Sequence, residues 1–465
     1  MSKFHSSVSR REFMKAISLA GAGVSAAAAL APGFQDLDEL TASENTHTQH
    51  RWWVKERDYE DITTPIDWNV FAAWSATRYP AVPMVTQANT EAKARATEWM
   101  KQANLSGKPN CTTKDLGIWA AVNNVTAIPA WDGPVPASWG FDAVRHDATP
   151  EENLSILRAA LHYFGAPRAG GIELDEHTKR LFDDGKWVWE DIDKGFMDAK
   201  KVYHIPNKCK YLVVWYTKQE YTQARYGIGE VGDDNRAMPL GYASNRHAYS
   251  HAPAVNIKAM TFVKALGYQA YSARFMAGMQ ANVPLGIFSG LAEQGRTAYS
   301  LSPDHGLSLR YMDYVLTDLP IAPSKPIDAG LVNFCKVCAR CADVCPTNSV
   351  TKDNDISWEP VGPFNRTGFK GWHMNIQTCW DFGSPGNCCV CQTACPFNHP
   401  EASMVHPIIR ATVGNTSIFN NFFARMDGFM KYSEYENGEE SWWNRDLRTW
   451  KHDTLYGYGS AEGVW

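Results

Sequence analysis

Two short runs of cysteine constrain this chain more than any other feature of its sequence. The first, at residues 335–346, follows the spacing C-x2-C-x2-C-x3-C-P, and the second, within residues 379–396, keeps the ending C-x2-C-x3-C-P. This spacing is typical of bacterial ferredoxins, in which three close thiolates bind one 4Fe-4S cluster and the fourth binds its neighbour. A disulfide framework is disfavoured, because C-x2-C pairs would strain a bridge and exported scaffolds scatter their cysteines. The runs therefore predict two 4Fe-4S clusters.

The crossed arrangement of ferredoxin ligands divides eight cysteines between the two clusters. The predicted ligands are Cys335, Cys338, Cys341 and Cys395 for the first cluster, and Cys379, Cys388, Cys391 and Cys345 for the second. In the second run the first ligand is displaced to Cys379, which lengthens the loop before Cys388. Cys389 does not fit the spacing. We interpret it as a packed or uncoordinated thiol, or as an exchange partner for Cys388 if the loop folds differently.

The first 31 residues have the pattern of an export signal. Arg10 and Arg11 precede an uncharged stretch of small and apolar residues at 16–31, which ends in Ala-Leu-Ala. This pattern predicts a twin-arginine signal peptide over residues 1–31, cleaved near Pro32. A membrane anchor is the alternative, but the stretch is shorter than the roughly twenty residues that cross a bilayer. Because the twin-arginine route carries folded proteins, we expect a cofactor to be loaded in the cytoplasm.

The composition limits the partners of the chain. Its 45 Lys and Arg and 50 Asp and Glu give a formal charge of -5, and both signs are interspersed, so a nucleic-acid partner is not expected. No later segment is apolar enough over a sufficient length to span a membrane, so attachment to a membrane would need a partner protein. The 18 Trp, 19 Tyr and 20 Phe would suit either a large aromatic core or a large apolar pocket.

The middle of the chain predicts a mixed α/β core. Thr149, Pro150 and Glu152 form the start signal of a helix that ends at Gly165, and a strand is expected around residues 171–172. A second helix is expected up to residue 266, followed by a strand at 268–272, and the apolar run at 210–217 reads as a buried strand. The fold class is therefore α+β or α/β, with a two-cluster ferredoxin-type module behind the core.

These signals divide the chain into five predicted parts. Residues 1–31 are the signal peptide, 32–148 an aromatic-rich N-terminal region, 149–330 the α/β core, 331–400 the two-cluster module and 401–465 a C-terminal tail that wraps the other parts.

Several segments together resemble a known family. The twin-arginine leader, the α/β middle, GLAEQGR at 290–296, LTDLPIAPSKPIDAG at 316–330 and the stretched second cysteine run resemble the corrinoid-dependent reductive dehalogenases of organohalide-respiring bacteria. The resemblance covers nearly the whole chain. It implies a base-off corrinoid of the cobalamin type, held without covalent bonds in a nitroreductase-like α/β core. The corrinoid signature D-x-H-x-x-G is not found in the sequence, which fits a family without a protein ligand below the cobalt.

The resemblance also implies a reaction and its partners. Two 4Fe-4S clusters would feed a Co(I) corrinoid that replaces carbon-halogen with carbon-hydrogen in a small organohalide, as the terminal reductase of organohalide respiration. The protein would lie at the outer face of the cytoplasmic membrane, bound to a small integral-membrane anchor protein, and would take electrons from a donor of a respiratory chain.

The residues that match the family's site are a tyrosine and an arginine. Tyr249 would donate the proton, with Tyr242 as the fallback donor, and Arg296 would stabilise the phenolate and the departing halide. Asn282 and Trp380 are candidates for the substrate pocket, although core packing is the plainer interpretation of Trp380.

Two histidines flank the predicted donor. We interpret His247 and His251 as structural, although an imidazole titrates near neutrality and an acid or ligand role is the alternative.

Two other functions compete with this interpretation. An exported electron-transfer subunit of the two-cluster ferredoxin type would hold no corrinoid. An epoxyqueuosine reductase shares the redox centres but acts on tRNA, and the export signal and the lack of basic character oppose it.

Overall fold

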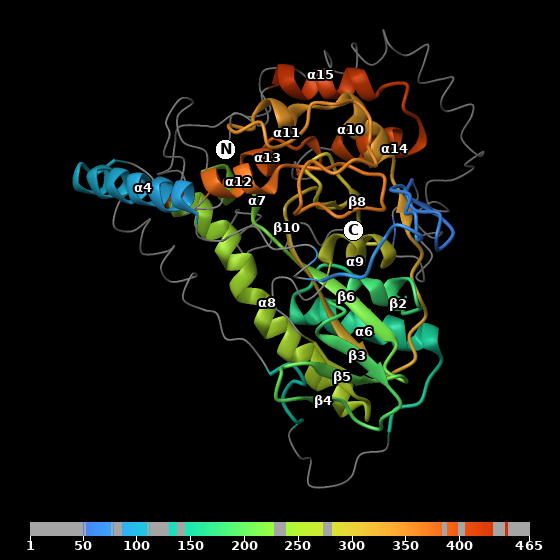
Figure 1. Cartoon of the computed structure of the whole chain (residues 1–465). Coiled ribbons are helices and arrows are strands. Elements are labelled where there is room, and N and C mark those ends of the chain that lie inside the picture. The colour runs from blue at the N-terminus through green and yellow to red at the C-terminus, as the bar shows by residue number, and fades with distance from the viewer. Residues whose placement is uncertain are drawn as a thin grey trace. The chain divides into compact units, whose positions relative to one another are not determined.

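The computed structural model places a four-stranded antiparallel sheet at the centre of the core (Figure 1). Its strands, in order across the sheet, are β2 (Ala169–Glu173), β6 (Tyr211–Lys218), β10 (Leu309–Thr317) and β7 (Ala270–Tyr271). Every neighbouring pair in this sheet is antiparallel. The strands predicted at 210–217 and 268–272 are confirmed as β6 and β7, and the strand predicted around 171–172 is confirmed as β2.

Helix α6 (Pro150–Phe164) forms for the reason that its sequence indicates. The Thr149 side chain accepts a hydrogen bond from the backbone N–H of Glu152, and the Glu152 carboxylate accepts one from the backbone N–H of Thr149. This reciprocal capping box satisfies two backbone donors that the first turn leaves without partners. Gly165 ends the helix in the left-handed conformation, at φ 109°, which a residue without Cβ adopts at little cost.

Helix α8 (Pro239–Ala265) is longer than predicted, because the sequence signal was confined to its second half. Its first half is buried on several sides and therefore shows no single apolar stripe, and it contains Pro253. A proline inside a helix removes one backbone hydrogen bond and usually marks a helix end. The missing apolar stripe and Pro253 together hid the true start of α8. The helix runs from α7 (Tyr221–Arg225) along the sheet to α6 (Figure 1).

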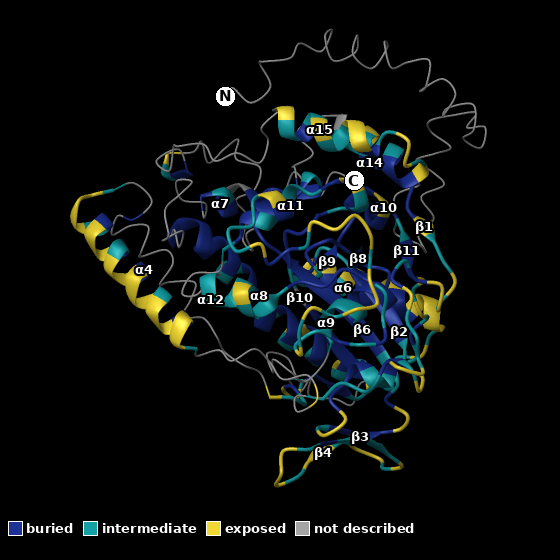
Figure 2. Cartoon of the chain, turned by 45° about the horizontal axis from the view of Figure 1, so that its top comes forward, coloured by how far each residue is buried: buried dark blue, intermediate teal, exposed yellow. Residues whose placement is uncertain are grey.

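Both faces of the sheet are covered, which explains its continuous apolar strands. Val213 and Trp215 of β6 pack with α6 and α8 on one face. Leu212 and Val214 point to the other face, where they pack with Phe288 of α9 (Asn282–Phe288). Side chains alternate between the faces of a strand, so a strand buried on both sides needs apolar residues at every position. In Figure 2 this sheet is dark blue, whereas one side of α4 (Gln87–Leu105) is exposed.

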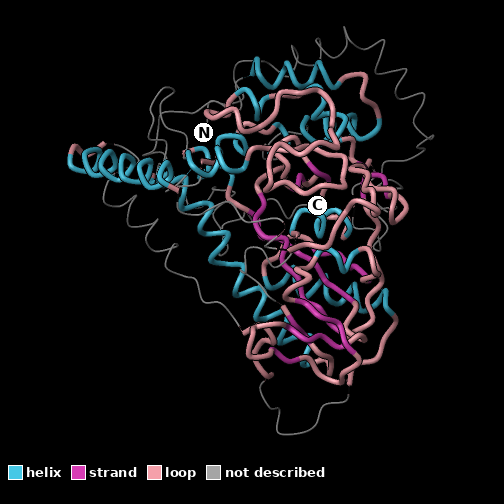
Figure 3. Tube along the Cα trace, viewed as in Figure 1, coloured by secondary structure: helices cyan, strands magenta, loops and turns pink. Residues whose placement is uncertain are grey.

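The two cysteine runs lie on short helices. These are α10 (Leu331–Val337), α11 (Arg340–Asp343), α12 (Ile376–Gly383), α13 (Val390–Thr393) and the 3-10 turn η3 (Pro396–Asn398). The helices α14 (Val405–Asn415) and α15 (Asn420–Met430) pack on α10, and α4 packs on α12. Figure 3 shows that loops connect these short helices, in contrast to the sheet region.

Small strands complete the described structure. One sheet pairs β1 (Lys55–Glu56) with β11 (Ile327–Asp328). A second has the strand order β3 (Trp187–Glu190), β5 (Tyr203–Pro206) and β4 (Phe196–Met197), and the 3-10 turn η2 (Thr178–Leu181) precedes β3. A third pairs β8 (Glu293–Gln294) with β9 (Ser300–Leu301).

The structure describes residues 50, 53–75, 78, 86–108, 111, 130–136, 145–226, 239–272, 281–383, 388–398, 405–430 and 442–444. The predicted signal peptide at 1–31 lies outside these residues, as does most of the tail predicted at 401–465 beyond α15. The described residues from Val54 onward form one compact unit, so the predicted boundaries at 148, 330 and 400 stay predictions.

Among the described helices, none is both long and apolar enough to cross a bilayer.

Candidate active site and cluster sites

The predicted cluster ligands come together as two groups of thiols. Burial raises the pKa of the Cys341 thiol, and the thiols that raise it further are Cys335, Cys395 and Cys338. Around Cys388 the thiols that raise its pKa, after burial, are Cys389, Cys379 and Cys345, and around Cys391 they are Cys388, Cys341, Cys379 and Cys389. These neighbours are compatible with the two predicted sets of four, and the assignment of each thiol to a cluster stays a prediction. None of these eight cysteines, all of them described, forms a disulfide.

Such groups of thiols have the chemistry of a metal site. Several buried thiols that raise one another's pKa do not ionise together without a compensating cation. Coordinated iron supplies that charge and deprotonates its thiol ligands. The donor set therefore fits two iron-sulfur clusters.

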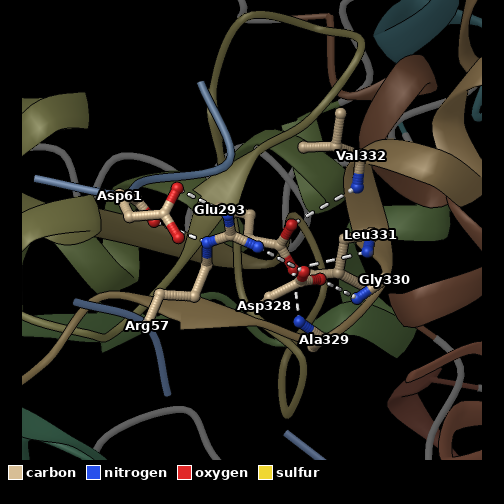
Figure 4. A network of polar contacts seen from close by, with 8 residues as sticks. All are labelled: Arg57, Asp61, Glu293, Asp328, Ala329, Gly330, Leu331 and Val332. Atoms are coloured by element: carbon tan, nitrogen blue, oxygen red, sulfur yellow. Dashed lines mark hydrogen bonds and ion pairs between the residues drawn. The ribbon is translucent and has the colours of Figure 1, made fainter. Parts of the chain in front are cut away.

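A single segment holds the first cysteine run in place from its N-terminal side. The carboxylate of Glu293 accepts hydrogen bonds from the backbone N–H groups of Ala329, Leu331 and Val332, at 2.8, 3.3 and 3.4 Å, as Figure 4 shows. These groups belong to the start of α10, where backbone N–H groups have no helical partners and attract negative charge. The side chain of Glu293 is fully buried. It therefore fixes the helix that carries Cys335.

Arg296 binds the backbone at the C-terminal end of α10, within the same run. Its guanidinium donates to the backbone carbonyls of Cys335 and Cys338 at 3.0 and 3.1 Å, and to that of Thr351 at 3.0 Å. It also stacks on Trp372, with the guanidinium carbon 4.4 Å from the ring centre. All these partners lie in or beside the cysteine runs, so the structure does not bring Arg296 to Tyr249, as the predicted catalytic pair requires. The hairpin of β8 and β9 directs the arginine toward the first run instead.

Gln294 extends this arrangement to the segment before the second run. Its amide donates to the carbonyl of Trp372 at 3.1 Å and accepts from the N–H of the same residue at 2.8 Å. Residues 293–296, which we call the EQGR clamp, therefore bind the backbone of both cysteine-bearing segments. The sequence marked this segment only through its resemblance, and its structural role was missed.

The cation that lies beside Tyr249 is Arg310. Tyr249 is half-buried on α8, and the Arg310 guanidinium carbon lies 5.8 Å from the centre of its ring. Arg246, one turn earlier on α8, lies at 5.9 Å from the same ring. Arg310 stands at the start of β10, where the register with β6 shifts. The sequence gives no sign of this contact, because it joins a strand to a helix about sixty residues away along the chain.

The fallback donor Tyr242 has a cation of its own. Its hydroxyl accepts a hydrogen bond of 2.6 Å from Nε of Arg246. Burial raises the pKa of Tyr242, whereas Arg246 lowers it. Two tyrosine and arginine pairs therefore lie next to each other along the first half of α8.

Tyr299, which no sequence pattern marked, connects this region to the second cysteine set. Burial raises the pKa of its phenol, the thiols of Cys379 and Cys391 raise it further, and Arg310 lowers it. Tyr299 is nevertheless 38% exposed. It therefore lies at an accessible position near Arg310 and the second set.

The other predicted site residues lie further from Tyr249. Asn282 begins α9, which packs on the opposite face of the sheet from α8, and its Oδ1 atom is buried without a hydrogen-bond partner in the described part of the chain. Trp380 lies on α12, where its carbonyl accepts a bond of 3.4 Å from Asn89 of α4. Burial lowers the pKa of His251 to about 3, which agrees with the structural role predicted for it. No described contact joins Asn282 or Trp380 to Tyr249.

The cysteine-bearing region matches a known family model. Residues 334–398 match the model Fer4_16, described as a 4Fe-4S double cluster binding domain. The match begins just before Cys335 and ends just after Cys395. It agrees with the two predicted clusters and with the two groups of thiols.

The whole chain matches characterised relatives. It is 30% identical to a chloroethene reductive dehalogenase of Dehalococcoides mccartyi strain VS, over 96% of this chain and 98% of the relative. It is 28% identical to a trichloroethene reductive dehalogenase of Dehalococcoides mccartyi strain ATCC BAA-2266, over 95% of this chain and 97% of the relative.

A solved structure has the same fold. It is a reductive dehalogenase whose title concerns B12-dependent dehalogenation, and it superposes with a TM-score of 0.56 at 17% identity, over 87% of this chain. The chain spans about half of that protein, since the match covers 53% of it. The fold, the double-cluster region and the identity along almost the full length agree, and the chain belongs to the reductive dehalogenases.

Proposed function

We propose that this protein removes a halogen from a small organohalide and replaces it with hydrogen, using electrons that pass through its two 4Fe-4S clusters to a bound corrinoid. The observation that carries the proposal is the position of Tyr249 beside Arg310, with Tyr299 near both of them and near the thiols of Cys379 and Cys391. A proton donor, a fixed cation and an electron source are the three groups that this reaction needs. The nitroreductase-like description of the core is part of the same proposal.

The described residues fit an amide-rich cofactor. Among the buried acceptor atoms without a hydrogen-bond partner in the described part of the chain are Oε1 of Gln219, Oδ1 of Asn256 and Oγ1 of Thr297. A buried polar atom without a partner costs free energy, so such atoms mark places where a bound group completes the bonding. The peripheral amides of a corrinoid carry N–H donors that would satisfy these acceptors. When bound, a corrinoid supplies a cobalt centre that accepts electrons and cleaves the carbon-halogen bond.

Tyr249 would supply the proton. A phenol gives up its proton more readily when a cation stabilises the phenolate, and Arg310 stays charged at any working pH. The guanidinium would also attract the departing halide. In this proposal Arg310 takes the role that the resemblance suggested for Arg296.

The path of the electrons follows from the positions of the thiols. The second set adjoins Tyr299 and Arg310, so its cluster would deliver electrons to the site. Cys391 of this set also has Cys341 of the first set as a charged neighbour, so the two clusters would lie next to each other. The first cluster, beside α10, would receive electrons from the donor.

The location and partners of the protein remain part of the proposal. The predicted signal at residues 1–31 supports export by the twin-arginine route to the outer face of the cytoplasmic membrane. There a small integral-membrane anchor protein would hold the enzyme, and a donor of a respiratory chain would reduce it as the terminal reductase.

Chlorinated ethenes are the first substrates to test, because two relatives along the full length are named for chloroethene and trichloroethene. The chain would be loaded with iron, sulfide and cobalamin, reduced with a viologen and assayed for halide release. Wild type is expected to release chloride, and Tyr249→Phe to lose about a hundredfold or more in rate with unchanged metal and corrinoid content.

Tyr163→Phe is the matched control, because Tyr163 lies exposed on α6. It is expected to behave as wild type. A loaded protein that releases no halide from chlorinated ethenes, brominated alkenes or chlorinated aromatics would exclude the proposed activity.

A further inference from the structure

Arg310 is held by side chains from inside the second cysteine run. Its Nη2 atom donates to Oε1 of Gln392 at 2.8 Å and lies 3.8 Å from Sγ of Cys389. Gln392 directly follows the ligand Cys391, and Cys389 directly follows the ligand Cys388. Both acceptors of Nη2 therefore belong to the loop that would bind the second cluster, whereas Nη1 donates to the carbonyl of Leu309 at 3.4 Å.

These acceptors are themselves fixed. Gln392 is 5% exposed, its N–H donates to the carbonyl of Cys389 at 3.0 Å, and its own carbonyl accepts from Nδ2 of Asn398. Asn398 in turn accepts from the N–H of Ser308 at 3.1 Å, just before β10. The second run and the start of β10 are thus tied together on both sides of Arg310.

The strand alone does not determine where the charge of Arg310 lies. The register of β10 with β6 shifts directly after Arg310, and irregularities of this kind redirect side chains. An arginine side chain has several rotatable bonds, so the acceptor at its end selects one position for the guanidinium. Gln392 provides that acceptor at a distance typical of a charged hydrogen bond.

We propose that Gln392 is a positioning residue that places Arg310 against Tyr249, so that the proton-donating site is complete only when the second cysteine run is closed around its cluster. The inference rests on the proposed function, because it assigns Arg310 and Tyr249 to the reaction. Coulomb interaction weakens with distance, so a guanidinium released from Gln392 would stabilise a phenolate less. Cys389 would assist, since its Sγ also lies 3.6 Å from the amide of Gln219.

Two variants of Gln392 separate positioning from packing. Gln392→Leu keeps the approximate volume and removes the acceptor, and Gln392→Asn keeps the amide but shortens its reach. Loss of a hydrogen bond to a charged group predicts a fall in kcat of about tenfold to a hundredfold for both variants, with KM changed by less than about threefold.

Two readouts would not respond to packing alone. The basic limb of the pH–rate profile is expected to move to higher pH in the Leu and Asn variants, because a guanidinium released from Gln392 stabilises a phenolate less. Charged or titratable groups described near Tyr249 include Arg246 and Tyr242 of α8 and Tyr299, and none of them is altered. Iron content and the electron paramagnetic resonance signals of both clusters are expected to match wild type.

A double-mutant cycle with Arg310→Lys decides whether Gln392 acts through Arg310. If it does, the effect of Gln392→Leu on kcat shrinks to less than about threefold in the Arg310→Lys background. Equal effects in both backgrounds or full kcat in Gln392→Asn would each overturn the inference. If Gln392→Leu loses iron, the Asn variant decides. Full activity of Tyr249→Phe would instead refute the proposed function.

Discussion

The guanidinium of Arg296 stacks on the indole of Trp372 at 4.4 Å and donates to the carbonyl of Cys335 at 3.0 Å. One buried cation thereby joins the segment before the second cysteine run to the helix that carries the first. The contact explains why the module keeps its form although its helices are short and loops connect them. It also leads to the first prediction.

Arg296→Gln is expected to destabilise the fold and the first cluster. The change leaves the carbonyls of Cys335, Cys338 and Thr351 without their donor, and each buried group without a partner costs about 1–3 kcal/mol. Denaturant unfolding should show a loss of about 3 kcal/mol or more, and iron should fall below the about eight atoms of two full clusters. Arg95→Gln, at an exposed position of α4, is the control and should change the free energy of unfolding by less than about 0.5 kcal/mol. Full iron content with unchanged stability would contradict the role assigned to the clamp.

Glu293 predicts a dependence of stability on pH. Burial raises the pKa of its carboxyl from 4.5 to about 7, and Asp328 adds to this shift, although the N–H group of Ala329 opposes it. Between these two values the folded chain binds more protons than the unfolded chain, so the free energy of unfolding falls as the pH rises. The contribution is complete below pH 4.5 and is lost through pH 7, and it amounts to at most about 3 kcal/mol.

Glu293→Gln cannot titrate and should lack this slope. Urea unfolding at pH 5 and pH 8 is the measurement, and wild type should lose stability relative to the variant at the higher pH. Glu91→Gln, at an exposed position of α4, is the control and should follow wild type at both values. Parallel curves for wild type and Glu293→Gln would show that the carboxyl has the same pKa in both states.

Cys345→Ser is expected to remove the second cluster, although Cys345 lies in the first run. Its thiol is a neighbour that raises the pKa of Cys379 and Cys388, two predicted ligands of the second cluster. Electron paramagnetic resonance of the reduced protein should lose the signal of the second cluster and retain the first. Cys209→Ala removes a buried thiol below the sheet and should retain both signals. Loss of the first cluster in Cys345→Ser would refute the crossed assignment.

Thr149→Ala is expected to destabilise α6 by about 1 kcal/mol, because it removes the acceptor for the N–H of Glu152. Thermal or denaturant unfolding measures the change. Thr90→Ala, in the interior of α4, is the comparison, since its hydroxyl only bonds a carbonyl one turn earlier. It should be neutral or slightly stabilising, because alanine favours a helix. Equal losses in the two variants would show that the capping box contributes nothing.

Local signals predicted those parts of the structure whose causes are local. The cap and the apolar stripe of α6 and the apolar run of β6 each lie within a few residues of chain, and the structure reproduces them. The spacing of the cysteines is equally local, and the double-cluster family model matches the region that contains it. The start of α8 was missed, because that half of the helix is buried on several sides and shows no periodic pattern.

The partners of the arginines could not be predicted, because tertiary packing sets them. Arg310 and Gln392 are 82 residues apart in the chain, and Arg296 meets the carbonyl of Thr351 across 55 residues. Every residue has a backbone carbonyl, whatever its side chain. The residue pattern therefore does not distinguish an arginine that binds carbonyls from one that faces a substrate. The resemblance pointed to Arg296 alone, and Arg310 was found only from the structure.

The sharing of ligands between the two runs has a consequence for biogenesis. In the crossed assignment Cys395 belongs with Cys335 and Cys338, and Cys345 belongs with Cys379 and Cys388. The ligand set of the second cluster would then be complete only at residue 391 and that of the first only at residue 395, so a nascent chain interrupted between the runs would carry no complete centre at all.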